Sequence, residues 1–355
     1  MGSNTRLFQI RGSIPKWVYR RLALMSRMIA GWFVPVSLMI VAPLIPIRAF
    51  GQDGSWMREL QVYDQKLATI GYRLQISAGD LCPRRQSLIG IAIQDITQYR
   101  VRDQAQARQV FGFEGHPKIL AVAEGSAFDI AGVRPDDSIL AIDGEPINEV
   151  GHGRASSAAT VAAANELLET AAQDGLLVMT LRRGGVDRQV TIALQYGCAT
   201  SFQTALTGSI DAAADGDAVE VDIGAMRFAE DDAQIAAVVA HELAHNILRH
   251  RERLTTAGVR STRGARNIRL TRQTEEEADR LSVYLLDRAG YATSAIVSFW
   301  SREDARSTAL DRLHGTPVER ITTIKGEIAR LDQMKAAGVT ARPAFMMSDN
   351  LPPLR

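Results

Sequence analysis

The sequence predicts an α+β fold, in which a small β-rich domain is followed by a mainly α-helical domain. Between residues 83 and 197, short apolar runs alternate with Gly and Asp, a pattern typical of strands joined by tight turns. Two later stretches, 233–250 and 275–289, are long and contain neither Gly nor Pro, which is typical of helices. At roughly 100–200 residues per domain, a chain of 355 residues is long enough for two domains with separate cores.

Composition and charge exclude several classes of protein. The chain has 41 basic and 40 acidic residues, so its formal net charge is +1, whereas a generic nucleic-acid-binding protein shows a clear basic excess. Its hydrophobic fraction of 46% is too high for a disordered chain. Two cysteines are too few for a four-thiolate zinc site or a disulfide-dense scaffold. We therefore expect a folded protein without a nucleic-acid partner.

The N-terminal segment, residues 1–51, has the layout of a secretion signal. It contains seven basic residues and no acidic one, and the twenty residues 28–47 are uncharged. The small residues Ala49 and Gly51 then have the spacing of a signal-peptidase site. The uncharged stretch is also long enough to span a bilayer as a permanent anchor. Prolines that weaken a long helix favour cleavage over anchoring, namely Pro35, Pro43 and Pro46.

Both interpretations of the N-terminal segment place the rest of the chain outside the cytoplasm. A disulfide can persist in such a compartment. Because Cys82 and Cys198 flank the predicted β-rich domain, we predict a disulfide that joins the two ends of that domain. The alternative is a pair of unrelated buried thiols.

The elements of the first half follow from hydrophobic periodicity and turn signals. Residues 52–82 are predicted to be a helical connector, with its helix at 56–76. The β-rich domain occupies 83–197, and Asp143-Gly144 ends one of its strands with a tight-turn signal. Its predicted elements are strands at 88–93, 118–123, 138–142, 176–181 and 189–194, and a helix at 158–172.

The run at 124–147, E-G-S-A-F-D-I-A-G-V-R-P-D-D-S-I-L-A-I-D-G-E-P-I, resembles PDZ domains of the bacterial periplasmic-protease type. The resemblance implies a groove between a strand and a helix, in which an extended peptide adds to the sheet as a further strand. The strand edge, and the amides that receive the peptide carboxylate, would come from Gly90, Ile91, Ala92 and Ile93. A PDZ domain can also serve only as a spacer or brace, and this alternative stays open.

His241, Glu242 and His245 form an H-E-x-x-H motif within the predicted helix at 233–250. Histidines four residues apart project from one face of a helix, about one turn apart. In this pattern two neutral imidazoles bind Zn²⁺, while the glutamate takes a proton from zinc-bound water. The neighbouring residues are apolar, as in a buried active-site helix rather than one with two surface histidines: Val238, Val239, Leu243, Ile247 and Leu248.

A catalytic zinc usually has three protein ligands and one position open to water. Among the remaining histidines, His250 lies five residues after His245 and is predicted to point away from the ligand face of the helix. The helix at 275–289 offers a carboxylate instead. There Glu275 and Asp279 share one face at i, i+4 spacing, so that one can bind the metal while the other supports a ligand imidazole.

At this point the sequence resembles the gluzincin metallopeptidases of the HtpX and BepA type, the family that includes the CAAX prenyl proteases. The resemblance covers residues 209–331, with Asp211 where the family usually has Asn. The family's E-x-x-A-D motif matches 275–279. The resemblance implies that Glu275 is the third ligand of one Zn²⁺ per chain, and that Asp279 supports a zinc-bound histidine.

A third motif of the family, H-P-x-x-x-x-R, resembles the segment from His314 to Arg320, with Gly315 in place of the usual proline. The resemblance implies that His314 stabilises the oxyanion of the reaction, or that it has a structural role, and that Arg320 supports the site. It also implies a zincin-type catalytic domain at 198–342. The tail at 343–355 is predicted to be irregular because it contains Pro343, Pro352 and Pro353.

Together these parts predict an exported zinc endopeptidase that cleaves envelope proteins. It would be periplasmic, or anchored to the inner membrane and facing the periplasm, with protein or peptide substrates and a PDZ domain for peptide binding or regulation. Glu242 would act as the proton carrier, and the strand at 219–222 is expected to pair with an extended substrate. The alternative is a PDZ-based peptide-binding or chaperone-like factor whose zinc site is latent.

The stretch 249–272 contains eight arginines and one acidic residue, Glu252. It lies between the two zinc-motif helices and is predicted to be a mobile basic loop. Its role is either that of a solvated linker, or that of a lid or a contact with anionic lipid headgroups.

Overall fold

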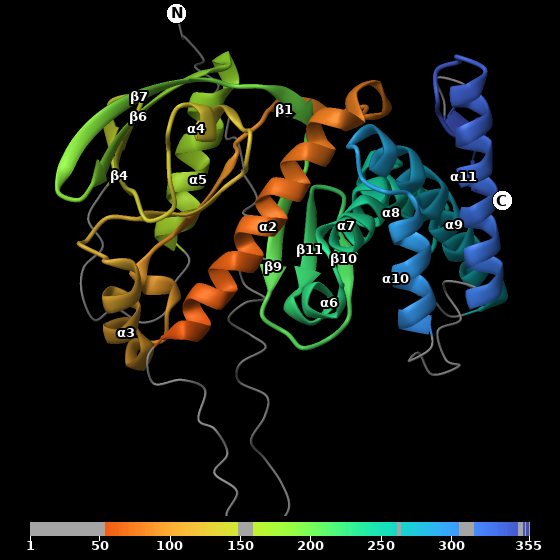
Figure 1. The fold of residues 1–355 in the computed structure, drawn as a ribbon, viewed down its shortest axis with the longest axis horizontal. Helices are drawn as coiled ribbons and strands as arrows, with labels where there is room; N and C mark the ends of the chain where they lie inside the picture. Colours follow the sequence, from red (N-terminus) through yellow and green to blue (C-terminus); the bar gives the residue numbers. More distant parts are fainter. Residues whose placement is uncertain are drawn as a thin grey trace, which may run out of the picture. The chain divides into compact units, whose positions relative to one another are not determined.

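A computed structural model describes residues 54–147, 159–260, 264–304, 316–346, 351 and 353–354. The predicted signal peptide or anchor at 1–51 and the candidate residue His314 lie outside these residues. Helices and sheets both occur, so the mixed α and β class is confirmed (Figure 1). Gly51–Arg355 form one compact unit, and the domain boundaries predicted within it stay predictions. Among the described residues, no helix is both long enough and apolar enough to cross a membrane.

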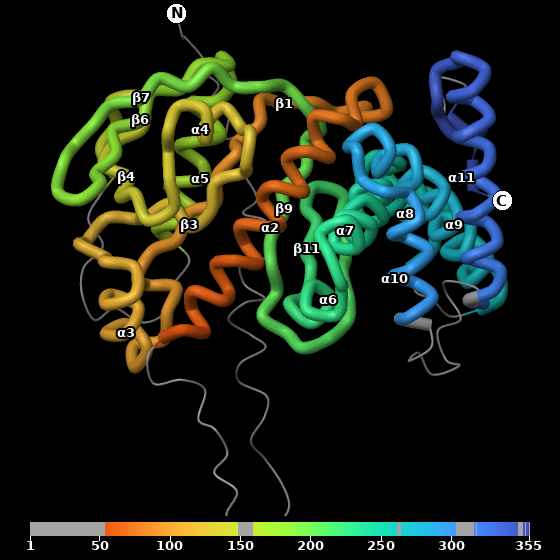
Figure 2. Tube along the Cα trace, viewed as in Figure 1, coloured from red at the N-terminus to blue at the C-terminus, as the bar shows by residue number. Residues whose placement is uncertain are grey.

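The largest sheet is antiparallel, and its strands lie in the order β2, β3, β4, β6 and β7, with β5 paired to β4. Their bounds are β2 (Ile91–Gln94), β3 (Lys118–Val122), β4 (Ser138–Ile142), β5 (Glu145–Pro146), β6 (Leu176–Arg183) and β7 (Val186–Ala193). The strand predicted at 138–142 has exactly the bounds of β4. The strands predicted at 176–181 and 189–194 form one hairpin (Figure 2), in which β6 continues to Arg183 and β7 begins at Val186. Its turn places Gly184 and Gly185 at positive φ.

This sheet has a hydrophobic core of its own. Alternate residues of β6 point into it, and Leu177, Met179 and Leu181 are fully buried. The predicted helix at 158–172 is present as α5 (Ala159–Ala171), which contacts β2 and β4. Two further helices, α3 (Val101–Phe111) and the short α4 (Ala127–Ile130), were not predicted. Helix α3 buries only three residues and is otherwise polar, so its apolar periodicity is weak.

A smaller, three-stranded sheet precedes the H-E-x-x-H helix. It consists of β9 (Ser201–Ala205), β10 (Ala212–Ala214) and β11 (Ala218–Asp222). Strand β11 is the central one, antiparallel to β10 and parallel to β9. The expectation that the strand at 219–222 pairs with substrate is therefore wrong, because both of its edges already carry neighbouring strands.

Helices dominate the C-terminal half and pack around the largest hydrophobic cluster. They are α6 (Ile223–Phe228), α7 (Asp232–Ile247), α8 (His250–Thr256), α9 (Ala265–Arg288), α10 (Ser294–Asp304) and α11 (Pro317–Ala336). Helix α7 begins after Asp231, whose side chain accepts a hydrogen bond from the Gln234 amide. Helix α11 begins with a capping box between Thr316 and Glu319. Within the predicted tail, residues 344–346 form a single 3₁₀ turn.

The basic stretch 249–272 is mostly helical, so the prediction of a loop is wrong. Helix α8 occupies its first part, and α9 begins at Ala265, ten residues before the predicted start at 275. Arginine is a good helix former. Leu270 of the early α9 is buried, which gives this segment an apolar contact in the folded protein.

The predicted helix at 56–76 is present as α2 (Ser55–Ala78) and contacts both parts of the fold. It touches β3 of the large sheet and also β9, α7 and α9, and Figure 1 shows it running between the two groups of elements. Gly71 lies in the middle of this helix, where a Cβ atom would come within 2.5 Å of the Phe202 ring. Glycine at this position lets α2 approach β9 closely, at some cost in helix propensity.

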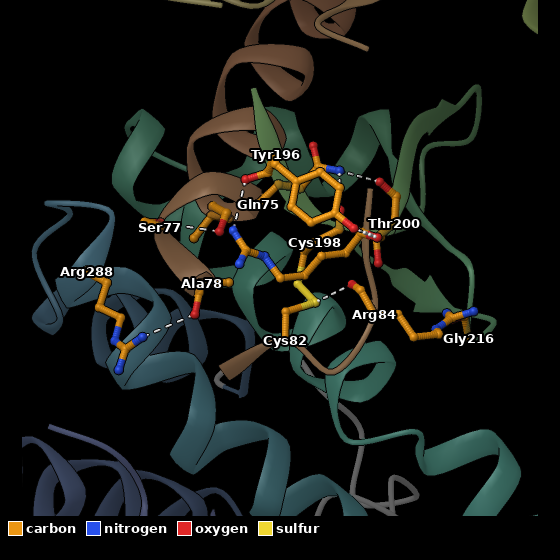
Figure 3. The surroundings of a disulfide bond; sticks show 12 residues. Gln75, Ser77, Ala78, Cys82, Arg84, Tyr196, Cys198, Thr200, Gly216 and Arg288 are labelled. Carbon is orange, nitrogen blue, oxygen red and sulfur yellow. Dashed lines mark hydrogen bonds between the residues drawn. A yellow bond between two sulfur atoms is a disulfide. The ribbon is translucent and has the colours of Figure 1, made fainter. Parts of the chain in front are cut away.

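The predicted disulfide between Cys82 and Cys198 is confirmed (Figure 3). It joins the segment after α2 to β8 (Tyr196–Cys198), which pairs with β1 (Arg85–Ser87). Gln75 of α2 adds to this junction, because its side-chain amide donates hydrogen bonds to the carbonyl oxygens of Cys198, at 2.9 Å, and Thr200, at 2.6 Å. The two ends of the segment 83–197 are thus held together at the end of α2.

Candidate metal centre

Helix α7 places two imidazoles beside each other, as the four-residue spacing predicted. The Nε2 atoms of His241 and His245 are 3.2 Å apart. His241 is buried, whereas 16% of the His245 side chain is exposed, so the pair can be reached from one side. Two imidazole nitrogens that face each other this closely need a cation or a proton between them, because two lone pairs would repel.

Helix α9, which packs against α7, supplies a carboxylate to the same point. Oε2 of Glu275 lies 3.3 Å from Nε2 of His241 and 3.5 Å from Nε2 of His245. Two ligands held at about 2.0–2.1 Å from a tetrahedral metal ion are about 3.3 Å apart, so these separations fit a single ion. His241, His245 and Glu275 therefore form a group that can hold a metal ion.

The second ring nitrogen of His241 is bound by a buried ion pair. Its Nδ1 lies 2.9 Å from Oδ1 of Asp279, and both oxygens of Asp279 accept hydrogen bonds of 2.8 Å from the guanidinium group of Arg320. Burial alone would lower the pKa of His241, but hydrogen bonds to Asp279 and Glu275 outweigh it and raise that pKa to about 9. Despite burial, Arg320 and His241 lower the pKa of Asp279, so this carboxylate stays ionised.

An aromatic side chain covers this ion pair. Cζ of Arg320 lies 3.7 Å from the ring centroid of Trp300, which belongs to α10. The same ring lies edge-on to His241, at 5.7 Å between centroids. Trp300 thus provides a cation–π contact that holds the Arg320 side chain against Asp279. Trp300 was not predicted from the sequence, since no spacing rule connects it to the motifs.

The second ring nitrogen of His245 contacts His250, which is not a ligand, as predicted, but whose contact with His245 was not foreseen. Nδ1 of His245 lies 2.9 Å from Nδ1 of His250, and Nε2 of His250 lies 3.2 Å from Oε2 of Glu277. Nη1 of Arg253 donates to the same oxygen at 2.5 Å. The prediction assumed one continuous helix through His250, but α7 ends at Ile247 and Arg249 has a left-handed φ of 54°.

The surroundings of His250 and Glu277 shift the pKa of each side chain strongly. Burial lowers the pKa of His250 to about 4, so its ring is neutral at neutral pH. Burial would raise the pKa of Glu277, but hydrogen bonds from His250 and Arg253 outweigh it and lower that pKa to about 2. His250 is 2% exposed and takes no part in the three-residue ligand group.

The remaining candidate residues lie in different places. Glu242 is half-buried on α7, next to His241. His314 is outside the described residues, so no contact can be assigned to it. Gly90–Ile93 lie at the β2 edge of the large sheet, beside α5, and not at the ligand group. Comparison of the sequence with models of known protein families gave no match, and comparison with curated proteins gave none either.

Proposed function

We propose that this protein is an exported zinc-dependent endopeptidase of the gluzincin type. The observation that supports the proposal most directly is the convergence of two imidazoles and one carboxylate from α7 and α9, within 4.8 Å of one another. Nitrogen and oxygen donors in this number, with exposure on one side, suit a catalytic zinc that keeps a position open. Zinc would supply Lewis acidity, which acidifies water and polarises a carbonyl group.

The chain's own residues would divide the remaining work. His241, His245 and Glu275 hold the ion, and the Asp279–Arg320 pair orients the ring of His241. The carboxylate of Glu242 accepts a proton from the attacking water and delivers it to the leaving amine nitrogen. Glu242 is partly exposed on α7, next to the ligand His241.

An extended substrate needs a strand edge near the site, and β10 is the better candidate. Among the described residues β10 pairs only with β11, and it contacts α7. A peptide added to this edge would make backbone hydrogen bonds next to the helix that carries the histidines.

The proposal extends to export and to the PDZ-like segment. The disulfide between Cys82 and Cys198 supports export, because such bonds are rare in the cytoplasm. The β2 edge and its contact with α5 support a peptide-binding groove built from Gly90–Ile93. Peptides bound there would be substrates or regulators of the protease.

The decisive experiment is the Glu242→Gln substitution, assayed with a casein-type substrate in the presence and absence of a chelator. We expect cleavage to fall by about 10²- to 10⁴-fold, because the proton carrier is lost, while zinc stays bound by the three ligands. The matched control is Glu276→Gln, which alters an exposed side chain that pairs with Arg280 and should leave cleavage unchanged. Undiminished cleavage by Glu242→Gln would contradict the proposal.

The second candidate is a peptide-binding or chaperone-like factor with a latent zinc site. The observation that favours it is the β2 edge beside α5, which needs no metal to bind a peptide. It would be preferred if the protein binds unfolded polypeptides but cleaves none of them with zinc present.

A further inference from the structure

The two candidate zinc-binding imidazoles are supported in different ways. Nδ1 of His241 contacts a carboxylate, that of Asp279. Nδ1 of His245 contacts another imidazole, that of His250, whose Nε2 contacts the carboxylate of Glu277. Both chains of contacts end in an arginine, Arg320 in the first and Arg253 in the second.

The hydrogen bonds in the second chain can run in only one direction if His245 binds a metal. Its Nε2 faces the ligand group, so the lone pair lies there and the proton of the neutral ring lies on Nδ1. That N–H must donate to Nδ1 of His250, 2.9 Å away, which therefore carries no proton. The proton of His250 then lies on Nε2 and is donated to Oε2 of Glu277.

Glu277 suits the end of such a chain. Besides His250, it accepts hydrogen bonds from Arg253, and Gln273 donates to its other oxygen at 3.0 Å. An ionised carboxylate can only accept, so it selects the His250 tautomer with the proton on Nε2. The backbone serves the same arrangement, since the left-handed residue Arg249 turns the chain so that His250 lies behind His245.

We propose that His250 is a positioning residue that fixes the ring orientation and the tautomer of His245, with Glu277 fixing the tautomer of His250. This inference rests on the proposed zinc site. The hydrogen bond raises the basicity of a ligand imidazole and removes its freedom to rotate, both of which strengthen metal binding. His250 does not touch the reacting atoms and acts only through His245.

Two substitutions with similar side chains separate this role from simple packing. In His250→Asn the amide lies where Nδ1 of histidine lies, so its oxygen can still accept from His245. In His250→Gln the amide lies where Nε2 lies, so Glu277 keeps a donor while His245 loses its acceptor. His250→Leu removes both hydrogen bonds and is the second variant should His250→Gln fail to fold.

The measurements are the Zn²⁺ dissociation constant, by competition with a chelator, and the absorption spectrum of the Co²⁺-loaded protein. We expect His250→Gln and His250→Leu to bind Zn²⁺ about 10- to 100-fold more weakly, with altered Co²⁺ bands. His250→Asn should stay within a few-fold of the native protein and keep its spectrum. Equal affinity in the native protein and His250→Leu, or equal loss in His250→Asn and His250→Gln, would overturn the inference.

Glu275→Gln separates this inference from the proposed function. If the native protein and Glu275→Gln bind Zn²⁺ equally weakly, the metal site itself fails. If the native protein binds Zn²⁺ tightly, Glu275→Gln binds it weakly and all three His250 variants equal the native protein, the site stands and the role of His250 is refuted.

Discussion

Charged side chains buried around the ligand group are tolerated because each has a partner. Asp279 is buried with Arg320, and Glu277 with Arg253. Breaking one such pair leaves an uncompensated charge, at a cost of about 3–5 kcal/mol, so neither arginine is replaceable by a neutral residue without loss of stability. These pairs contribute more to orienting the histidines than to net stability, because desolvation offsets most of their attraction.

A buried tyrosine on α9 makes the stability of the fold pH-dependent. Tyr284 donates a 2.6 Å hydrogen bond to Glu327 on α11, and burial followed by this bond raises the pKa of Tyr284 above its usual value of 10.0. The unfolded chain therefore loses this proton first. The stability that Tyr284 contributes is fully present below pH 10.0 and is lost as the pH rises above it.

We therefore expect Tyr284→Phe to be less stable than the native protein by about 1–3 kcal/mol at neutral pH, since buried Glu327 loses its donor. The difference should shrink as the pH rises above 10.0, where only the native protein has a phenol to ionise. Urea unfolding at several pH values measures both effects. A stability difference that does not change with pH would contradict this account.

At the scale of elements, the break between α7 and α8 decides which side chain supports His245. Helix α7 ends at Ile247, and Arg249 takes a left-handed conformation before α8 begins at His250. The sequence shows no glycine or proline there. This left-handed residue thus brings the ring of His250 against that of His245.

This conformation can be tested with two substitutions at Arg249, whose exposed side chain pairs with Glu252. Arg249→Gly should leave stability unchanged or raised, because glycine adopts positive φ without strain. Arg249→Val should cost about 1–2 kcal/mol and weaken Zn²⁺ binding, since a β-branched residue resists this φ. Thermal unfolding and chelator competition measure the two effects, and equal results for the two variants would argue against a strained turn.

At the scale of the whole described unit, α2 and the disulfide connect the sheet to the helices. Helix α2 packs on β3 and on β9. Two of its side chains also form ion pairs with the helical part, Lys66 with Asp232 of α7 and Glu59 with Arg227 of α6. These exposed ion pairs are each worth at most about 1 kcal/mol. Tight packing at Gly71 and the disulfide are therefore the stronger connections.

The disulfide links residues 116 positions apart and so restricts a long loop of the unfolded chain. Replacing both cysteines by alanine should lower the free energy of unfolding by about 2–5 kcal/mol. Guanidinium unfolding with and without a reductant is the measurement, and the double variant, which has no disulfide to reduce, is the control. If the native protein were as stable with the reductant as without it, the disulfide would contribute nothing.

Spacing along the chain predicted four of the helices and placed the candidate ligands on two of them. The choice of Glu275 rather than Asp279 as the third ligand came from the family resemblance. His241 and His245 share a face of α7, because four residues make about one helical turn, and the same rule joined Glu275 and Asp279 on α9. The strand at 138–142 was predicted from the turn signal that follows it. The disulfide was predicted from the export that the N-terminal segment indicates and from the positions of the two cysteines. These are properties of one element or of composition, so they do not depend on how the elements meet.

Contacts between elements could not be read in this way. The sequence predicted that His250 is not a ligand but did not show its contact with His245, left Trp300 and Arg253 unnoticed and offered the central strand β11 as a substrate edge. Each depends on where the chain turns and which segments then become neighbours. Local spacing sets the direction of a side chain within one element, whereas the partner it meets there is decided by packing between elements far apart in sequence.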